Sequence, residues 1–152
     1  MIDHLDDTST GSDTQQQAVD AAMDAETDLE SARRQLFELN GITDAMMDHW
    51  KANFGDVVWT SFLVPGVAHA VIFVYRTITR GEWKRQVRPL IQKPDITQDV
   101  ANEIVASYVT LYPVPARETT YWESMPAFIP DSISEFVMNV SGGQPATQPM
   151  RL

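Results

Sequence analysis

The side chains that most often carry out acid–base, metal or nucleophilic chemistry are sparse and scattered in this sequence. Its three histidines are His4, His49 and His69, and none stands at metal-ligand spacing from a carboxylate, as in the H-E-x-x-H motif. The chain has no cysteine, no G-x-S-x-G motif and no phosphate-binding glycine loop. The aspartates of residues 3–7 lack the spacing of an EF-hand calcium loop. We therefore expect a protein that is not an enzyme and has no metal, no cofactor and no small-molecule substrate.

The more informative chemistry is cationic. Basic side chains recur every four residues over 76–88, a spacing that would align them along one side of a helix. Like charges at this spacing repel one another, and an acidic partner would relieve the repulsion. Three interpretations stay open: a solvent-facing helix surface, a docking face for an acidic segment of this chain or of a partner, and, least favoured, a nucleic-acid-binding face. The stripe consists of Arg76, Arg80, Lys84 and Arg88.

This stripe crosses a predicted junction between a strand and a helix. Residues 71–75 are β-branched or aromatic, as in a buried strand. Thr79 and Glu82 then form the T-x-x-E pattern of a capping box, which predicts that a helix begins here. We expect that helix to end near Pro89, whose ring clashes with the carbonyl four residues earlier.

The remaining pattern predicts helices around one hairpin. Strands over 56–64 and 68–76 flank a Pro-Gly turn at Pro65. Thr43 or Asp44 is expected to cap a helix that ends at Gly55. Further helices are expected from Asp95 or Thr97 to the Tyr112-Pro113 pair, and from the Pro130-Asp131 pair to the Gly142-Gly143 pair.

Residues 114–130 are expected to form a loop that drapes over the body. The segment is rich in proline, which excludes regular structure over most of its length. Its large aromatic side chains can serve either as core residues or as anchors at an interface with a partner. They are Tyr121, Trp122 and Phe128.

Charge separates the N-terminal region from the rest. The net charge is −10 and the chain has 21 acidic residues, nine of which lie in residues 1–32, where there is no Lys or Arg. This acidity argues against nucleic acid as a partner, and no apolar run approaches the ~20 residues of a membrane span. We expect a mainly helical α+β fold, with helices packed around the hairpin. The predicted divisions are a flexible, disordered acidic arm (1–14), an N-terminal helix (15–40), a globular helical domain with the hairpin (41–143) and a flexible tail (144–152).

Several short motifs resemble those of one protein group. Residues 49–55 read H-W-K-A-N-F-G, and residues 73–84 read F-V-Y-R-T-I-T-R-G-E-W-K. Farther along are L-Y-P at 111–113, P-A-F-I-P at 126–130 and S-G at 141–142. In this order the motifs are similar to those of the tail-assembly chaperones and baseplate-hub assembly proteins of tailed bacteriophages.

The resemblance covers residues 46–143 and omits the acidic arm. Trp83 stands where that group has Tyr, and Ile78 where it has Leu, both mild changes. The resemblance implies a non-enzymatic protein–protein interaction role in tail or baseplate assembly, with other phage tail, baseplate or virion proteins as partners. It places the protein in the host cytoplasm during assembly, or in the virion. The alternative is a permanent virion structural protein, such as a head–tail connector or a tail or capsid accessory subunit.

Overall fold

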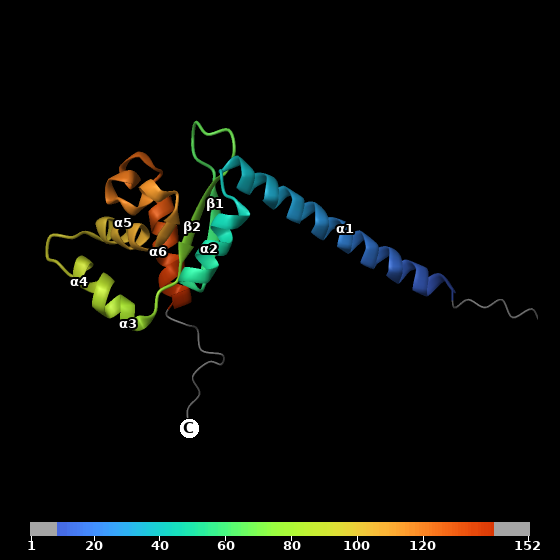
Figure 1. The fold of residues 1–152 in the computed structure, drawn as a ribbon, viewed down its shortest axis with the longest axis horizontal. Coiled ribbons are helices and arrows are strands. Elements are labelled where there is room, and N and C mark those ends of the chain that lie inside the picture. Colours follow the sequence, from blue (N-terminus) through green and yellow to red (C-terminus); the bar gives the residue numbers. More distant parts are fainter. Residues whose placement is uncertain (1–8, 142–152) are drawn as a thin grey trace, which may run out of the picture. The chain divides into compact units, whose positions relative to one another are not determined.

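The computed structural model describes residues 9–141 of the chain, which forms two compact units, 1–41 and 42–152. In the first unit, α1 runs without interruption from Ser9 to Leu39 (Figure 1). Residues 9–14 are therefore helical rather than part of a disordered arm, because a helix once formed gains one hydrogen bond for each residue added to its end. Residues 1–8 and the predicted tail, 144–152, lie outside the described residues.

The second unit is α+β and mainly helical, as predicted. Strands β1 (Val57–Phe62) and β2 (Val71–Arg76) form the predicted antiparallel hairpin, with Trp59 opposite Val74. Helix α2 (Asp44–Phe54) precedes the hairpin and ends, as predicted, at Gly55, whose φ of 69° is in the region that favours glycine.

A third strand, β3 (Thr110–Tyr112), was not predicted. It pairs with β2 to give an antiparallel sheet in the order β1-β2-β3. The helix expected to reach Tyr112 ends instead at Val109, as α5 (Gln98–Val109). Residues 110–112 are β-branched or large apolar and aromatic, and a residue before proline avoids the helical region, so this short segment extends and pairs with Tyr75.

Both faces of β2 are covered, which explains why its four central residues are buried. Phe73 and Tyr75 face α5 and α6 (Phe128–Ser141), while Ile72 and Val74 have the opposite orientation along the strand. Figure 1 shows β2 between two helical layers, with α5 and α6 on one side and α2 on the other. Trp50 of α2 is buried, and its ring lies 6.0 Å from that of Tyr112.

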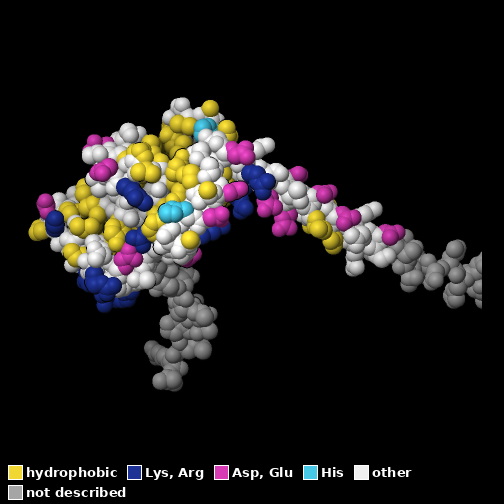
Figure 2. Space-filling view, viewed as in Figure 1, with side chains coloured by type: hydrophobic (Ala, Val, Ile, Leu, Met, Phe, Trp, Pro, Cys, Tyr) yellow, Lys and Arg dark blue, Asp and Glu magenta, His cyan; other side chains and the backbone are white. Residues whose placement is uncertain are grey.

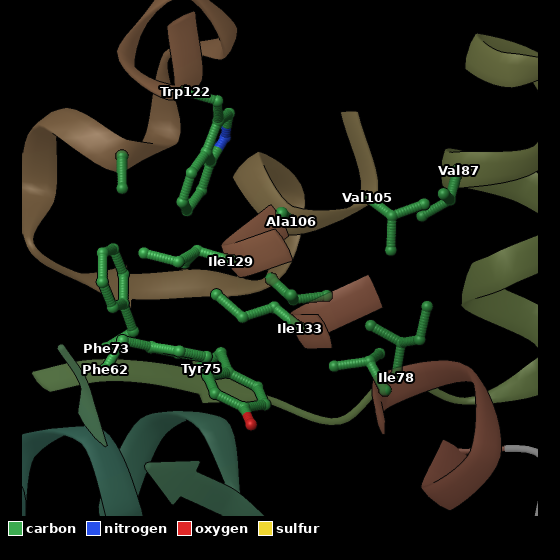
Figure 3. Packing of buried hydrophobic residues seen from close by; sticks show 13 residues of the cluster. Phe62, Phe73, Tyr75, Ile78, Val87, Val105, Ala106, Trp122, Ile129 and Ile133 are labelled. Atoms are coloured by element: carbon green, nitrogen blue, oxygen red, sulfur yellow. The ribbon is translucent and has the colours of Figure 1, made fainter. Parts of the chain in front are cut away.

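The core lies between the sheet and the pair formed by α5 and α6. Ile129 and Ile133 of α6 are fully buried at its centre, with Phe73 below them and Trp122 above (Figure 3). Val105 of α5 extends this core toward the helical segment that follows β2. Helix α6 therefore supplies the centre of the core.

That segment is one continuous helical run over residues 80–91. It consists of α3 (Arg80–Glu82), a π-helical turn (Trp83–Val87) and α4 (Arg88–Ile91). The run ends at Ile91, two residues past Pro89 and so near the predicted end, but Pro89 itself does not break the helix. In the π turn the Arg88 N–H bonds to the Trp83 carbonyl, five residues back, and this wider turn admits the proline ring without breaking the helix.

The proline-rich segment is more regular than the predicted loop. It contains two 3₁₀ turns, Val114–Arg117 and Thr119–Ser124, and α6 begins at Phe128 rather than at Pro130. Proline is tolerated in the first turn of a helix, where its missing N–H has no intrahelical acceptor.

Candidate protein-binding surface

The helical segment 80–91 is held at its start by a capping box. The Thr79 hydroxyl accepts a hydrogen bond from the Glu82 N–H at 3.1 Å. In return, the Thr79 backbone N–H bonds to the Glu82 carboxylate and helps to lower its pKa. Thr79 is therefore the predicted cap, and it fixes where the chain turns from β2 into the helix.

The Glu82 carboxylate also joins three elements. Nη2 of Arg76, at the end of β2, donates to Oε1 of Glu82 at 2.6 Å. The Tyr108 hydroxyl of α5 donates to the same oxygen at 2.8 Å, and the Arg76 guanidinium carbon lies 5.1 Å from the centre of the Tyr108 ring. The hydrogen bond from Arg76 is the main reason that the pKa of Glu82 is lowered. We refer to Arg76, Glu82 and Tyr108 as the Glu82 cluster.

This cluster removes Arg76 from the predicted stripe. Its side chain is only 18% exposed and its charge is compensated within the fold. The four-residue spacing does not extend back to Arg76 either, because Arg76 is in a strand and the helix begins at Arg80. Three of the four predicted stripe residues, Arg80, Lys84 and Arg88, are exposed on the helical segment.

Arg85 joins these three cations, and the sequence pattern did not single it out. It is exposed, and a Cβ added at Gly81 would lie 3.1 Å from its Nη1, so its guanidinium rests against the bare glycine backbone. A four-residue template misses Arg85 because the π turn contains more residues per turn than an α-helix. We call Arg80, Lys84, Arg85 and Arg88 the basic surface.

Basic side chains gather over α3 and α4 in Figure 2. Within the described part of the chain, no carboxylate forms an ion pair with the basic surface, since the two ion pairs present there are Arg76–Glu82 and Arg33–Glu30. The only carboxylate in residues 80–91 is Glu82, which the Arg76 guanidinium already occupies. The basic surface thus has four cations without an internal counter-charge among the described residues.

The three aromatic residues considered as anchors differ in exposure. Trp122 is 2% exposed, its ring lies 5.7 Å from that of Phe73, and its Nε1–H donates to the Ser107 hydroxyl at 2.8 Å. It is therefore a core residue and has no surface to offer a partner. Tyr121 is half-buried against the same core. Phe128 remains 51% exposed, with its ring 5.8 Å from that of Phe62.

An open cleft of about 530 Å³ lies between the π turn, α5 and α6. Its apolar lining includes Trp83 and Met138, and Asn102 is the centre of its polar lining. Asn102 donates to Asp131 at 2.9 Å and accepts from the Ser134 hydroxyl at 3.2 Å. These three polar groups satisfy one another.

The acidic side of this body lies on α5 and α6. Burial raises the pKa of Glu103, and the nearby carboxylates of Glu123, Asp99 and Asp131 raise it further. The body therefore has cations on residues 80–88 and mutually repelling carboxylates on α5 and its neighbours.

The residues first considered for chemistry are not brought together. His49 is on α2, 3.1 Å from the Asn53 amide, His69 is in the hairpin loop, and His4 lies outside the described residues. Between residues 9 and 141, no group of three or more His, Cys, Asp or Glu could hold a metal ion, and no helix is long and apolar enough to cross a membrane. Comparison with protein-family models, with curated proteins and with solved structures gives no match.

Proposed function

We propose that this protein is a non-enzymatic binding protein whose basic surface docks an acidic segment of another polypeptide. The observation that carries the proposal is that its four exposed cations have no carboxylate partner in the described part of the chain. Arginine favours carboxylates because its planar guanidinium can donate two parallel hydrogen bonds to them.

Charge alone gives such a surface only weak affinity. An exposed ion pair contributes about 0.2–1 kcal/mol, so four pairs give about 1–4 kcal/mol, which corresponds to millimolar binding or weaker. Leu90 is 43% exposed on the same segment, and Trp83 is half-buried there. We therefore propose that the partner segment combines carboxylates with apolar residues and that its binding is sensitive to salt.

An acidic polypeptide is a better candidate than nucleic acid. The chain has a net charge of −10, so it repels phosphates at long range, and the basic surface alone must overcome that repulsion. An acidic peptide carries fewer and more widely spaced charges than a duplex, and its apolar residues can contact Leu90.

The biological setting that we propose is the assembly of a bacteriophage tail or baseplate. What supports it is the resemblance of residues 46–143 to tail-assembly chaperones and baseplate-hub assembly proteins. The proposed partners are other tail, baseplate or virion proteins, met in the host cytoplasm. Mass spectrometry of purified particles separates the two roles: an assembly chaperone is absent from them, whereas a permanent structural subunit is present at fixed stoichiometry.

The docking proposal is tested with a labelled peptide of Glu-Glu-Leu repeats, followed by fluorescence anisotropy at low salt. The double variant Lys84→Glu/Arg88→Glu should abolish binding. The matched control Lys51→Glu/Arg117→Glu changes the net charge by the same amount at exposed positions on other elements and should leave binding unchanged.

Two results would contradict the docking proposal. Equal weakening by both double variants would mean that net charge, and not the basic surface, attracts the peptide. Tighter binding to a labelled DNA duplex than to the peptide at the same salt concentration would favour a nucleic-acid-binding protein instead.

A further inference from the structure

Helix α1 exposes apolar side chains along most of its length. Every described side chain from residue 12 to residue 35 is exposed, and Leu29 is 72% and Leu39 61% exposed. Near its end Leu36 is half-buried and Phe37 is buried. A long helix whose side chains are mostly exposed gains little stability from its own hydrogen bonds, and large apolar side chains left exposed on it indicate a surface that another element covers.

One row of apolar residues on α1 follows a heptad repeat, whereas Val19, Ala21, Met23 and Phe37 lie outside it. From residue 18 onward the residues of this row are separated alternately by four and three residues, an average period of 3.5, as in coiled coils. No polar residue interrupts this pattern up to the end of the helix. We call this row the seam of α1, and it consists of Ala18, Ala22, Ala25, Leu29, Ala32, Leu36 and Leu39.

We propose that the seam of α1 pairs with the seam of a second copy of this chain, in the antiparallel orientation. A parallel pair would place each seam residue opposite itself, which gives wide leucine layers at 29, 36 and 39 and narrow alanine layers at the other four positions. An antiparallel pair can place Leu29 opposite the second copy's Ala32. Leu36 and Leu39 then also lie opposite alanines, and every leucine layer has the same width, which packs closely.

The charges of α1 favour the same orientation. Between residues 13 and 30 the helix carries six carboxylates and no cation, and its cations are Arg33 and Arg34. Figure 2 shows acidic side chains along most of this helix. Among residues 9–141 of one chain, the ion pair that Arg33 makes is an exposed contact with Glu30 at 3.9 Å. In the antiparallel arrangement Glu26, which follows Ala25 in the heptad, lies beside the second copy's Arg33, and the reciprocal pair forms by symmetry.

A parallel pair is disfavoured by the same charges. It would place the six carboxylates of one copy alongside the six of the other, where like charges repel. The second copy is therefore a better occupant in the antiparallel orientation. This inference concerns α1 and does not depend on the basic surface or on the docking proposal.

The association state of the full chain tests the proposal. At tens of micromolar protein, analytical ultracentrifugation should give twice the chain mass of 17.1 kDa. Leu29→Asp, in the seam, should reduce the mass to that of one chain. Met23→Asp is the matched control, because Met23 is also exposed, at 61%, but lies outside the seam, and this variant should remain a dimer.

Orientation is tested by disulfide formation, which the absence of native cysteine makes unambiguous. Ala22 and the second copy's Leu39 face each other in the proposed register. A mixture of the Ala22→Cys and Leu39→Cys chains should therefore form a mixed disulfide on oxidation, whereas neither variant alone should cross-link. Cross-linking of each variant with itself would mean a parallel pair and would overturn the proposal.

Other outcomes also decide the matter. A wild-type chain that stays monomeric overturns the proposal. This is the result expected if α1 pairs with a helix of a different protein. A dimer that persists in Leu29→Asp overturns it too, because another surface must then hold the copies together. The Lys84→Glu/Arg88→Glu variant should remain dimeric, so failure of the docking proposal and failure of this one are distinguishable.

Discussion

Replacing Glu82 by glutamine removes one negative charge from the Glu82 cluster while keeping the shape of the side chain. Arg76 and Tyr108 can still donate to the amide oxygen, at the positions where they now lie 2.6 and 2.8 Å from the carboxylate. What is lost is the negative charge that Arg76, Tyr108 and the Thr79 backbone N–H all face. Glu82→Gln is therefore expected to destabilise the fold without altering its architecture.

The size of the effect follows from the two bonds. The Tyr108 bond changes from a charged to a neutral acceptor, which loses about 1 kcal/mol. Arg76 keeps its hydrogen bond but loses its counter-charge, which contributes about 0.2–1 kcal/mol for a solvent-exposed ion pair. The Arg76 and Glu82 side chains are 18% and 25% exposed, and solvent screening reduces the sum. We expect a decrease of about 1–2 kcal/mol in the free energy of unfolding at pH 7, or about 3–6 °C in Tm.

The pH dependence has a definite sign. The pKa of Glu82 is lowered in the folded state, chiefly by Arg76, so the folded protein binds this proton less readily than the unfolded chain does. Its contribution is fully present above the ordinary glutamate pKa of 4.5 and is lost as the pH falls through the lower, folded value. The difference between wild type and Glu82→Gln should therefore shrink as the solution is acidified below pH 4.5.

Urea unfolding followed by tryptophan fluorescence, at pH 7 and at a series of acidic pH values, measures both quantities. Glu118→Gln is the matched control, since Glu118 is exposed, and its free energy of unfolding should differ from that of wild type by less than about 0.5 kcal/mol. An unchanged midpoint for Glu82→Gln at pH 7 would refute the role assigned to this cluster. So would a destabilisation of the same size at every pH.

Two further substitutions test the acidic side and the core. Glu103→Gln should raise the unfolding midpoint at pH 7 and leave it unchanged below pH 4.5. The folded-state pKa of Glu103 is raised by burial and then by Glu123, so the fold favours the neutral form of this side chain. The stability that the neutral form gives is lost as the pH rises, and glutamine stays neutral at every pH. A lower midpoint at pH 7 would contradict this. Trp122→Phe should lower the free energy of unfolding, measured in urea, by about 1–3 kcal/mol. The reason is that the buried Ser107 hydroxyl loses the hydrogen bond that Trp122 Nε1–H donates to it at 2.8 Å; a change below about 0.5 kcal/mol would contradict this.

Local chemistry was sufficient to predict the helix starts that side chains cap. The hydroxyls of Thr43, Thr79 and Thr97 each accept from the backbone N–H three residues later, and all three residues were considered as caps from the sequence. The β1–β2 hairpin was predictable for the same reason, since a Pro-Gly turn separates two runs of strand-forming residues.

Long-range pairing was not predictable in this way. Residues 110–112 form a strand only because Tyr75, far away in the sequence, lies beside Thr110. The core position of Trp122 depends likewise on Phe73 and on a hydrogen bond to Ser107 of another helix. A single aromatic residue in a proline-rich segment carries no periodic signal that separates burial from exposure.

The membership of the basic surface depends on one π turn and one ion pair. In a straight α-helix the spacing of four residues between cations would have held, but the π turn adds Arg85 to the basic surface. The Arg76–Glu82 pair removes Arg76, and although the sequence identified Glu82 as part of a capping box, it did not show that the same carboxylate would also bind a strand residue. Sequence pattern therefore found the location of the surface but not its full composition.

Taken together, the two proposals predict how strongly the protein binds a partner that has two acidic segments. One basic surface is expected to bind weakly, because four exposed ion pairs contribute only about 1–4 kcal/mol. A dimer formed through α1 would carry two such surfaces on one particle, and a partner that repeats its acidic segment, as a symmetric assembly does, could engage both. The second contact is then intramolecular and can raise the apparent affinity by about 10²–10⁴ without any new interaction.

Leu29→Asp should therefore weaken binding to a two-segment acidic peptide by a factor in that range, yet leave binding to the one-segment peptide unchanged. Equal binding of both peptides by the wild-type chain would mean that the two surfaces cannot act together.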